Sequence, residues 1–192
     1  MITVKEIKKT FPRLKQLPKF DRQLEFASMV TEYMSEKNIY PIIVGGLAVE
    51  IYTRNDYQTH DIDFVSDGWK QFDELLSQLH FTRAERQWYH TDLELAVEVP
   101  SNFLEGSDDL VVELELPNGK ALYVISVEDM IIHRLEAIVF STTYPKEDED
   151  YEWAHRMFLI HQHDLDLEYL TRQAKLVKVW PYIEEWINNE QS

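Results

Sequence analysis

The stretch YPIIVGGLAVEIYTRNDYQTHDIDFVSD, which begins at Tyr40, restricts the fold of this chain more than any other part of the sequence. It opens with a short apolar run that has the length and branching of a buried strand, and this run leads directly into Gly45 and Gly46. A small amphipathic helix fits residues 47–52, and residues 61–65 have the pattern of a second strand. The sequence therefore predicts a strand, a Gly-Gly pair, a helix and another strand in close succession.

The second strand carries two acids, Asp61 and Asp63. Side chains alternate along a strand, so both carboxylates point to one face, roughly 6–7 Å apart at Cα, while Ile62 and Phe64 point into the core. Two such carboxylates repel each other unless a cation lies between them, and Mg²⁺ prefers a few carboxylate oxygens together with phosphate oxygens and water. The plainer alternative is a pair of acids that face solvent at the end of a strand.

The Gly-Gly pair, the short helix and the Asp61-x-Asp63 strand resemble the Gly-Gly…Asp-x-Asp core of the nucleotidyltransferase superfamily. The run GGLAVEIY…THDIDFV is similar to small bacterial members related to lincosamide and aminoglycoside nucleotidyltransferases, and to nucleotidyltransferase-like components of toxin–antitoxin systems. The resemblance implies an α/β (α+β) nucleotidyltransferase fold with a mixed β-sheet flanked by helices. We expect this domain, with an N-terminal arm and helix, over residues 1–125 and a C-terminal helical bundle over residues 126–192.

The same resemblance implies a reaction, the transfer of a nucleoside monophosphate from an NTP to a hydroxyl group. Two Mg²⁺ ions would be held by Asp61 and Asp63, and a third carboxylate is expected on a neighbouring strand. Glu98, in the alternating segment Leu93 to Val99, is the candidate for this third ligand and for the group that takes the hydroxyl proton. The alternative is that Glu94 and Glu98 simply face solvent.

The resemblance also suggests residues that contact the nucleotide: Gly45, Gly46, Arg54, Thr59 and His60. The two glycines would present backbone N–H groups to the β- and γ-phosphates, or would serve only tight packing between strand and helix. Two positions depart from the family pattern. Many members have Ser where this chain has Gly46, and related sequences often have Arg where it has Tyr57, so Arg54 is the candidate replacement.

The remainder of the chain follows simpler patterns. Residues 1–19, with two prolines and several basic residues, suggest a loosely attached arm anchored by Phe11 and Leu14. An Asn-Gly turn between two alternating runs predicts a hairpin over residues 110–125. Helical patterns are expected at residues 20–37, 69–79, 126–139, 149–161, 165–177 and 180–187, strands at 87–90 and 93–99, and a loop from Thr142 to Lys146.

The segment VEDMIIHRLEAI is similar to the helix that opens the helical part of these nucleotidyltransferase-like proteins. The acceptor is expected in a cleft between the sheet and the C-terminal helices. Arg134, Asp150 and Trp153 are the candidates for lining the acceptor side of that cleft.

The charge composition restricts the kinds of acceptor that this protein can be expected to bind. The net charge is −16, from 19 Lys and Arg against 35 Asp and Glu, and this balance disfavours a nucleic-acid acceptor because phosphate neutralisation needs clustered basic residues. A small-molecule or protein acceptor fits better. The sequence has no cysteine, and no apolar stretch approaches the roughly 20 residues that span a membrane. We therefore expect a cytoplasmic protein with no membrane segment.

Two other functional classes remain open. The chain can be a catalytically inactive nucleotidyltransferase-like protein that binds a protein partner, such as a toxin–antitoxin component, and the residues at positions 46 and 57 favour this alternative. It can also be a structural adaptor whose acidic surface binds a basic partner, in which case no metal effect is expected.

Overall fold

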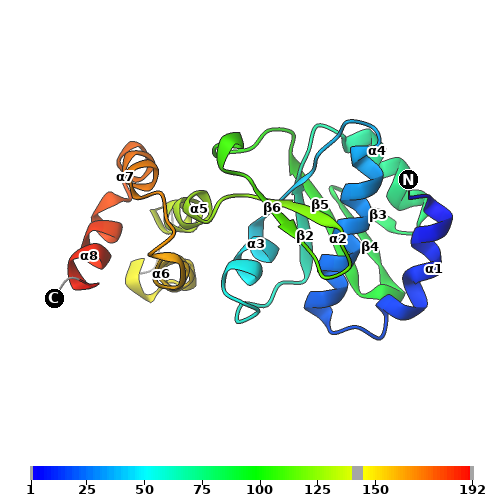
Figure 1. Cartoon of the computed structure of the whole chain (residues 1–192), viewed down its shortest axis with the longest axis horizontal. Helices are drawn as coiled ribbons and strands as arrows, with labels where there is room; N and C mark the ends of the chain where they lie inside the picture. Colours follow the sequence, from blue (N-terminus) through cyan, green and yellow to red (C-terminus); the bar gives the residue numbers. More distant parts are fainter. Residues whose placement is uncertain (1, 140–144, 191–192) are drawn as a thin grey trace.

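The computed structural model describes residues 2–139 and 145–190, and within these ranges seven strands form one mixed sheet in the order β3-β4-β5-β2-β1-β7-β6 (Figure 1). The strands are β1 (Ile42–Val44), β2 (Asp61–Val65), β3 (Thr82–Ala84), β4 (Gln87–His90), β5 (Leu95–Ser101), β6 (Val112–Glu115) and β7 (Ala121–Val124). β1 runs antiparallel to β2 and parallel to β7, and β2 runs parallel to β5. The α/β fold with a mixed sheet is therefore confirmed.

Helices flank this sheet and continue beyond it. The described chain contains α1 (Val4–Leu14), α2 (Lys19–Ser35), α3 (Gly45–Tyr52), α4 (Trp69–Gln78), α5 (Val127–Val139), α6 (Glu149–His161), α7 (Leu167–Leu176) and α8 (Trp180–Glu190). Short 3-10 turns are η1 (Thr91–Leu93), η2 (Asp108–Leu110) and η3 (Pro145–Glu147). Figure 1 shows an elongated molecule, with α1 at one end, the sheet in the middle and α5 to α8 at the other end.

The alternation in β2 determines which of its side chains enter the core. Ile62 and Phe64 are fully buried, and the Phe64 ring lies 5.3 Å from the Phe72 ring of α4. Asp61 and Asp63 are only partly buried, as expected for the opposite face of the strand. The carboxylates are thus held by a strand whose other face is fixed in the core.

Helix α1 corrects the expectation of a loosely attached arm. The Thr3 side chain accepts a hydrogen bond from the Glu6 N–H, and the Glu6 carboxylate accepts one from the Thr3 N–H at 2.8 Å, which together form a capping box. Ile7 and Leu14 are fully buried against the body of the protein. The capping box and the seven-residue spacing of the apolar pair outweigh Pro12, which lies within the helix.

Other boundaries differ slightly from expectation. The strand expected from Leu93 begins at Leu95, because Thr91–Leu93 forms a 3-10 turn and Glu94 adopts a left-handed conformation with φ of 49°. Strand β3 was not expected at all. The hairpin of β6 and β7 and the helix at Glu149–His161 are confirmed. Most of the loop expected from Thr142 to Lys146 lies outside the described residues.

The helical region is anchored to the sheet by buried polar contacts at the start of α5. The Asp129 carboxylate, 3% exposed, accepts hydrogen bonds from the Tyr169 hydroxyl at 2.6 Å, the Ser126 hydroxyl at 2.9 Å and the Ser107 N–H at 3.0 Å. These bonds tie α5 to α7 and to the loop after β5. They fix the side of α5 that is presented to the sheet.

Candidate active site

The candidate site begins with three carboxylates on two neighbouring parallel strands. In the β2/β5 ladder Asp63 lies opposite Glu98, and Asp61 lies opposite Ala96. Residues paired in register on adjacent strands point to the same face, so Asp61, Asp63 and Glu98 share one face. All three are partly buried. The structure therefore brings together the three acids that the sequence indicated.

The carboxylates on this face repel one another, because they lie close together and carry the same charge. Burial, and then the nearby charges of Glu98 and Asp61, raise the pKa of Asp63 to about 6. The Gly46 N–H and the Arg134 guanidinium act in the opposite direction and lower that pKa. Across the described ranges, none of the three carboxylates forms an ion pair with a Lys or Arg side chain. The site therefore carries negative charge that no basic side chain neutralises directly.

The donor atoms suit Mg²⁺, because all of them are carboxylate oxygens. Within the part of the chain that the structure describes, no group of three or more His, Asp or Glu side chains has the geometry to hold a metal ion without further ligands. Mg²⁺ commonly takes one or two protein carboxylates and completes its shell with water and phosphate oxygens, so a full protein cage is not needed. Asp61 and Asp63, with Glu98 beside them, fit that mode of binding.

Gly45 and Gly46 allow α3 to start directly against β2. Gly45 has a φ of +63°, and a Cβ atom there would overlap the Asp63 carboxylate. A Cβ atom on Gly46 would lie 2.5 Å from the Thr59 hydroxyl oxygen and 3.3 Å from the Tyr57 ring. Tight packing thus explains both glycines, and their contact with phosphate stays a prediction.

Of the other three residues predicted to contact the nucleotide, one lies at the site and two are exposed to solvent. Thr59 lies at the site, where its hydroxyl accepts a hydrogen bond from the Asp61 N–H at 3.4 Å. His60 is exposed, with its Nδ1 atom 3.0 Å from the Lys19 Nζ atom. Arg54 is also exposed, in the turn that follows α3, and it makes no ion pair within the described chain.

The residues predicted on the acceptor side are brought together. Arg134 of α5 makes an ion pair with Asp150 of α6, with Nη1 2.6 Å from Oδ1. The guanidinium lies 5.5 Å from the centre of the Tyr57 ring, and this ring meets the Trp153 ring edge-on at 5.1 Å. Tyr57 therefore joins Gly46 and the carboxylate face to the C-terminal helices.

Sequence reasoning missed the role of Tyr57, which it treated only as the place of an absent arginine. Tyr57 contacts Arg134 of α5, and the charge of Arg134 lowers the pKa of Asp63. The Nε atom of Arg134 is buried and has no hydrogen-bond partner within the described residues. An aromatic residue at a position where related sequences often have Arg was the signal that could have pointed to a contact between Tyr57 and an arginine elsewhere in the chain.

A cleft of about 400 Å³ opens beside the carboxylates, between the ends of β1, β2 and β5 and the helix α5. Gly45 and Arg134 lie on its border with the site. Most of the lining is apolar, and Ser101, Glu105, His133 and Arg134 supply its polar groups. The apolar part consists of Val44, Gly45, Val65, Pro100, Phe103, Leu104, Met130 and Ala137. The cleft lies between the sheet and α5, where the acceptor was expected from the sequence. Of the three acceptor-side candidates, Arg134 lines this cleft, whereas Asp150 and Trp153 do not, and binding of an acceptor here stays a prediction.

A family model described as a nucleotidyltransferase of unknown function (DUF6036) matches residues 18–189 of the chain. The protein belongs to this nucleotidyltransferase family. Among solved structures, an antigenic nucleotidyltransferase-like protein from Paracoccidioides brasiliensis is similar in fold, with a TM-score of 0.57 and 17% sequence identity, over 88% of this chain and 93% of that one.

No curated protein matches the sequence. Of the helices that the structure describes in this nucleotidyltransferase-family protein, none combines the length and apolar character needed to cross a membrane. At 17% identity the solved structure supports the fold alone.

Proposed function

We propose that this family member is a Mg²⁺-dependent nucleotidyltransferase that moves a nucleoside monophosphate from an NTP to a hydroxyl group of a small molecule or a protein. The observation that carries the proposal is the register of Asp63 with Glu98, beside Asp61, on a face whose negative charge has no direct basic partner. Family membership supports the reaction class. Neither comparison supports the alternative of an inactive toxin–antitoxin component.

The three carboxylates would bind Mg²⁺, and one of them would take the proton of the acceptor hydroxyl. Asp61 and Asp63, with Glu98 on the neighbouring strand, are the residues that would hold Mg²⁺. Bound Mg²⁺ would supply the positive charge that activates the acceptor hydroxyl and offsets the triphosphate. Glu98 accepts the proton of that hydroxyl as a general base. A bound cation would also offset the burial and the neighbouring carboxylate charges that raise the pKa of Asp63.

The phosphate side of the site is assembled from α3 and α5. Arg134 directs its charge toward Asp63 and has donor capacity beyond its ion pair with Asp150, since its Nε atom has no hydrogen-bond partner among the described residues. A guanidinium in this position stabilises the negative charge that develops on the transferred phosphoryl group. Tyr57 packs against the Arg134 guanidinium, and the Trp153 ring supports Tyr57 through the edge-on contact between the two rings.

The acceptor occupies the cleft beside Gly45 and Arg134. Its apolar walls, formed by residues such as Val65, Phe103 and Met130, favour an acceptor with an apolar body that presents a hydroxyl group toward Asp63. This placement aligns the hydroxyl with the carboxylates and leaves the nucleotide on the side of α3.

Pyrophosphate release tests the proposal. Each of the four NTPs is incubated with Mg²⁺, the protein and either small-molecule or protein fractions of a cell extract. We expect release with one fraction from the wild type and a loss of at least about 100-fold in Glu98→Gln, since Glu98 is the proposed base. Glu94→Gln is the matched control, because Glu94 is an exposed acid of the same segment that pairs with Arg22 instead. Release that survives Glu98→Gln, or no release with any fraction, would contradict the proposal.

A further inference from the structure

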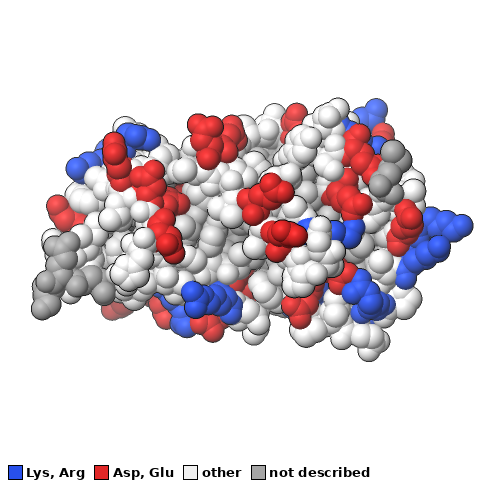
Figure 2. Space-filling view, in the orientation of Figure 1, with Lys and Arg blue, Asp and Glu red and all other residues white. Residues whose placement is uncertain are grey.

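Helix α1 is basic in a protein that is otherwise strongly acidic. Residues 4–15 contain five basic side chains and a single acid, Glu6, while the whole chain has a net charge of −16. Figure 2 shows Lys and Arg side chains gathered at the end of the molecule where α1 lies, whereas acidic side chains are spread over the rest of this face. The excess of basic residues on α1 makes its surroundings more favourable to anions than the net charge of the chain alone would indicate.

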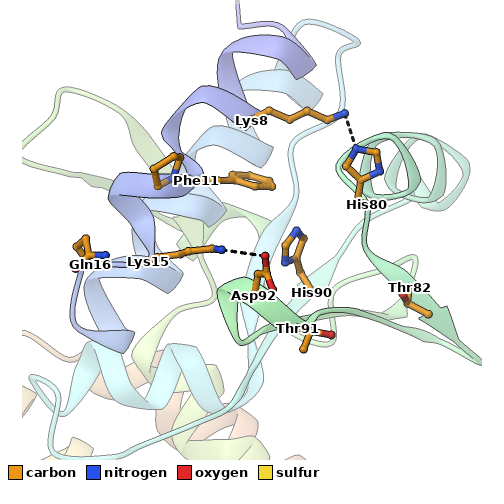
Figure 3. Close-up of a pocket in the computed structure, with 10 residues that line it drawn as sticks. Lys8, Phe11, Lys15, Gln16, His80, Thr82, His90, Thr91 and Asp92 are labelled. Carbon is orange, nitrogen blue, oxygen red and sulfur yellow. Dashed lines mark hydrogen bonds and ion pairs between the residues drawn. The ribbon is translucent and has the colours of Figure 1, made fainter.

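One face of α1 borders a hollow of about 660 Å³ (Figure 3). Lys8, Phe11 and Lys15 are spaced three and seven residues apart, so they lie along the same side of the helix. The opposite wall comes from two separate segments, with His80 after α4 and His90 at the end of β4. Two lysines and two imidazoles thus surround one hollow.

The contacts within the hollow leave it cationic. The Lys8 Nζ atom lies 3.0 Å from His80 Nε2, and since an ammonium only donates, the imidazole accepts and brings no negative charge. Lys15 is offset by Asp92, with Nζ 2.9 Å from Oδ2, and Asp92 is the single acid among the lining residues that the structure describes. The charge of Lys8 therefore has no acidic partner in the hollow.

An apolar ring lies between these polar groups. The Phe11 ring meets the His90 ring edge-on, with their centres 5.2 Å apart. Figure 3 shows the Lys8 and Lys15 side chains extending across the hollow on either side of Phe11. The hollow therefore offers cationic donors around an aromatic surface, which suits a ligand with an anionic group and a flat or apolar part.

This hollow is separate from the candidate active site. Its lining residues and those of the cleft beside the carboxylates have none in common. The helix that carries its lysines also precedes residue 18, where the match to the nucleotidyltransferase family begins. A ligand bound here would be an additional one, and family membership does not account for it.

We propose that the hollow binds a small molecule that bears a phosphate group. The ammonium groups of Lys8 and Lys15 and the imidazoles of His80 and His90 surround the phosphate, and the Phe11 ring lies under the rest of the ligand. Phosphate fits better than a single carboxylate, because its charge of about −1.5 to −2 and its three oxygens engage several donors at once.

The proposal is tested by NMR titration of the histidine side chains with inorganic phosphate and with pyrophosphate, at low salt and in EDTA. EDTA removes divalent metals, so binding at the carboxylates does not contribute and failure here leaves the proposed transfer reaction untouched. We expect saturable shifts of the His80 and His90 signals in the wild type. The Lys8→Gln/Lys15→Gln variant should bind at least about tenfold more weakly.

The matched control is Lys5→Gln/Lys9→Gln, which removes the same charge from exposed positions of α1 outside the hollow. We expect its affinity to stay within about twofold of the wild type. Each single variant, Lys8→Gln and Lys15→Gln, is titrated as well, after its thermal unfolding has been compared with that of the wild type. No saturable shift in the wild type, or an equal loss in both double variants, would overturn the proposal, since the second result would indicate diffuse attraction to a basic helix.

Discussion

Removing the charge of Asp63 should stabilise the protein while it impairs the proposed function. Burial and two neighbouring carboxylates raise the pKa of Asp63 from 3.8 to about 6. Each unit of pKa difference between folded and unfolded states corresponds to about 1.4 kcal/mol, so ionised Asp63 destabilises the fold by about 2–3 kcal/mol. Asp63→Asn removes this term and keeps an oxygen that can accept the Gly46 N–H.

The pH dependence of this gain has a definite sign. Between pH 3.8 and about 6 the folded state keeps a proton that the unfolded state has lost, so the free energy of unfolding of the wild type falls as pH rises through this window. The advantage of Asp63→Asn should therefore be complete above about pH 6 and absent below about pH 4. In a chain of this length it corresponds to roughly 5–10 °C in melting temperature at neutral pH.

The assay is urea unfolding of both proteins at several pH values in EDTA, with Asp164→Asn as the control. Asp164 is an exposed acid in the turn after α6, and its replacement should change the free energy of unfolding by less than about 0.5 kcal/mol. With Mg²⁺ added, the wild type should gain stability and Asp63→Asn should gain less. An Asp63→Asn protein that is less stable than the wild type at neutral pH would refute this account of the electrostatics.

Two further predictions concern packing around the site. Asp129→Ala should lower the free energy of unfolding in urea by about 2–4 kcal/mol, because it leaves the buried Tyr169 hydroxyl and two other donors without their acceptor. A decrease of less than about 1 kcal/mol would contradict the role of Asp129 in anchoring α5. Gly45→Ala should lower the free energy of unfolding by about 2 kcal/mol or more, since it adds overlap with Asp63 to the strain of a positive φ. Gly119→Ala, at a position with a φ of +75° and no atom within 4 Å of the added Cβ, should lower the free energy of unfolding by about 1 kcal/mol. Equal costs for the two glycine variants in the same unfolding assay would show that overlap with Asp63 is not significant.

The part of the site that depends on local pattern could be predicted from the sequence. Alternation along a strand places Asp61 and Asp63 on one face regardless of the rest of the fold, and the structure retains this arrangement. The choice of Glu98 as the third carboxylate came from the resemblance to a family. Its position opposite Asp63 depends on the pairing of β2 with β5, two strands separated by α4, β3 and β4, and neither strand encodes that pairing alone. The helices of the C-terminal region were also predictable, since their apolar spacing is regular.

What the sequence could not supply was contact between distant segments. Arg134 and Tyr57 are far apart in the chain and meet only because α5 packs beside the turn that precedes β2. Helix α1 was missed for a different reason. The two prolines and the basic residues of this segment suggested an arm, and the Thr3 and Glu6 capping pattern that starts the helix was overlooked.

The most direct test of the central claim is calorimetry of NTP binding. ATP, GTP, CTP and UTP are each titrated into the wild type and into Asp61→Asn/Asp63→Asn, with Mg²⁺ and with EDTA. We expect at least one NTP to bind the wild type in Mg²⁺, and binding to fall by at least about 100-fold in EDTA or in the double variant. Binding that persists without the metal and without both aspartates, or no binding of any NTP to the wild type, would contradict the central claim.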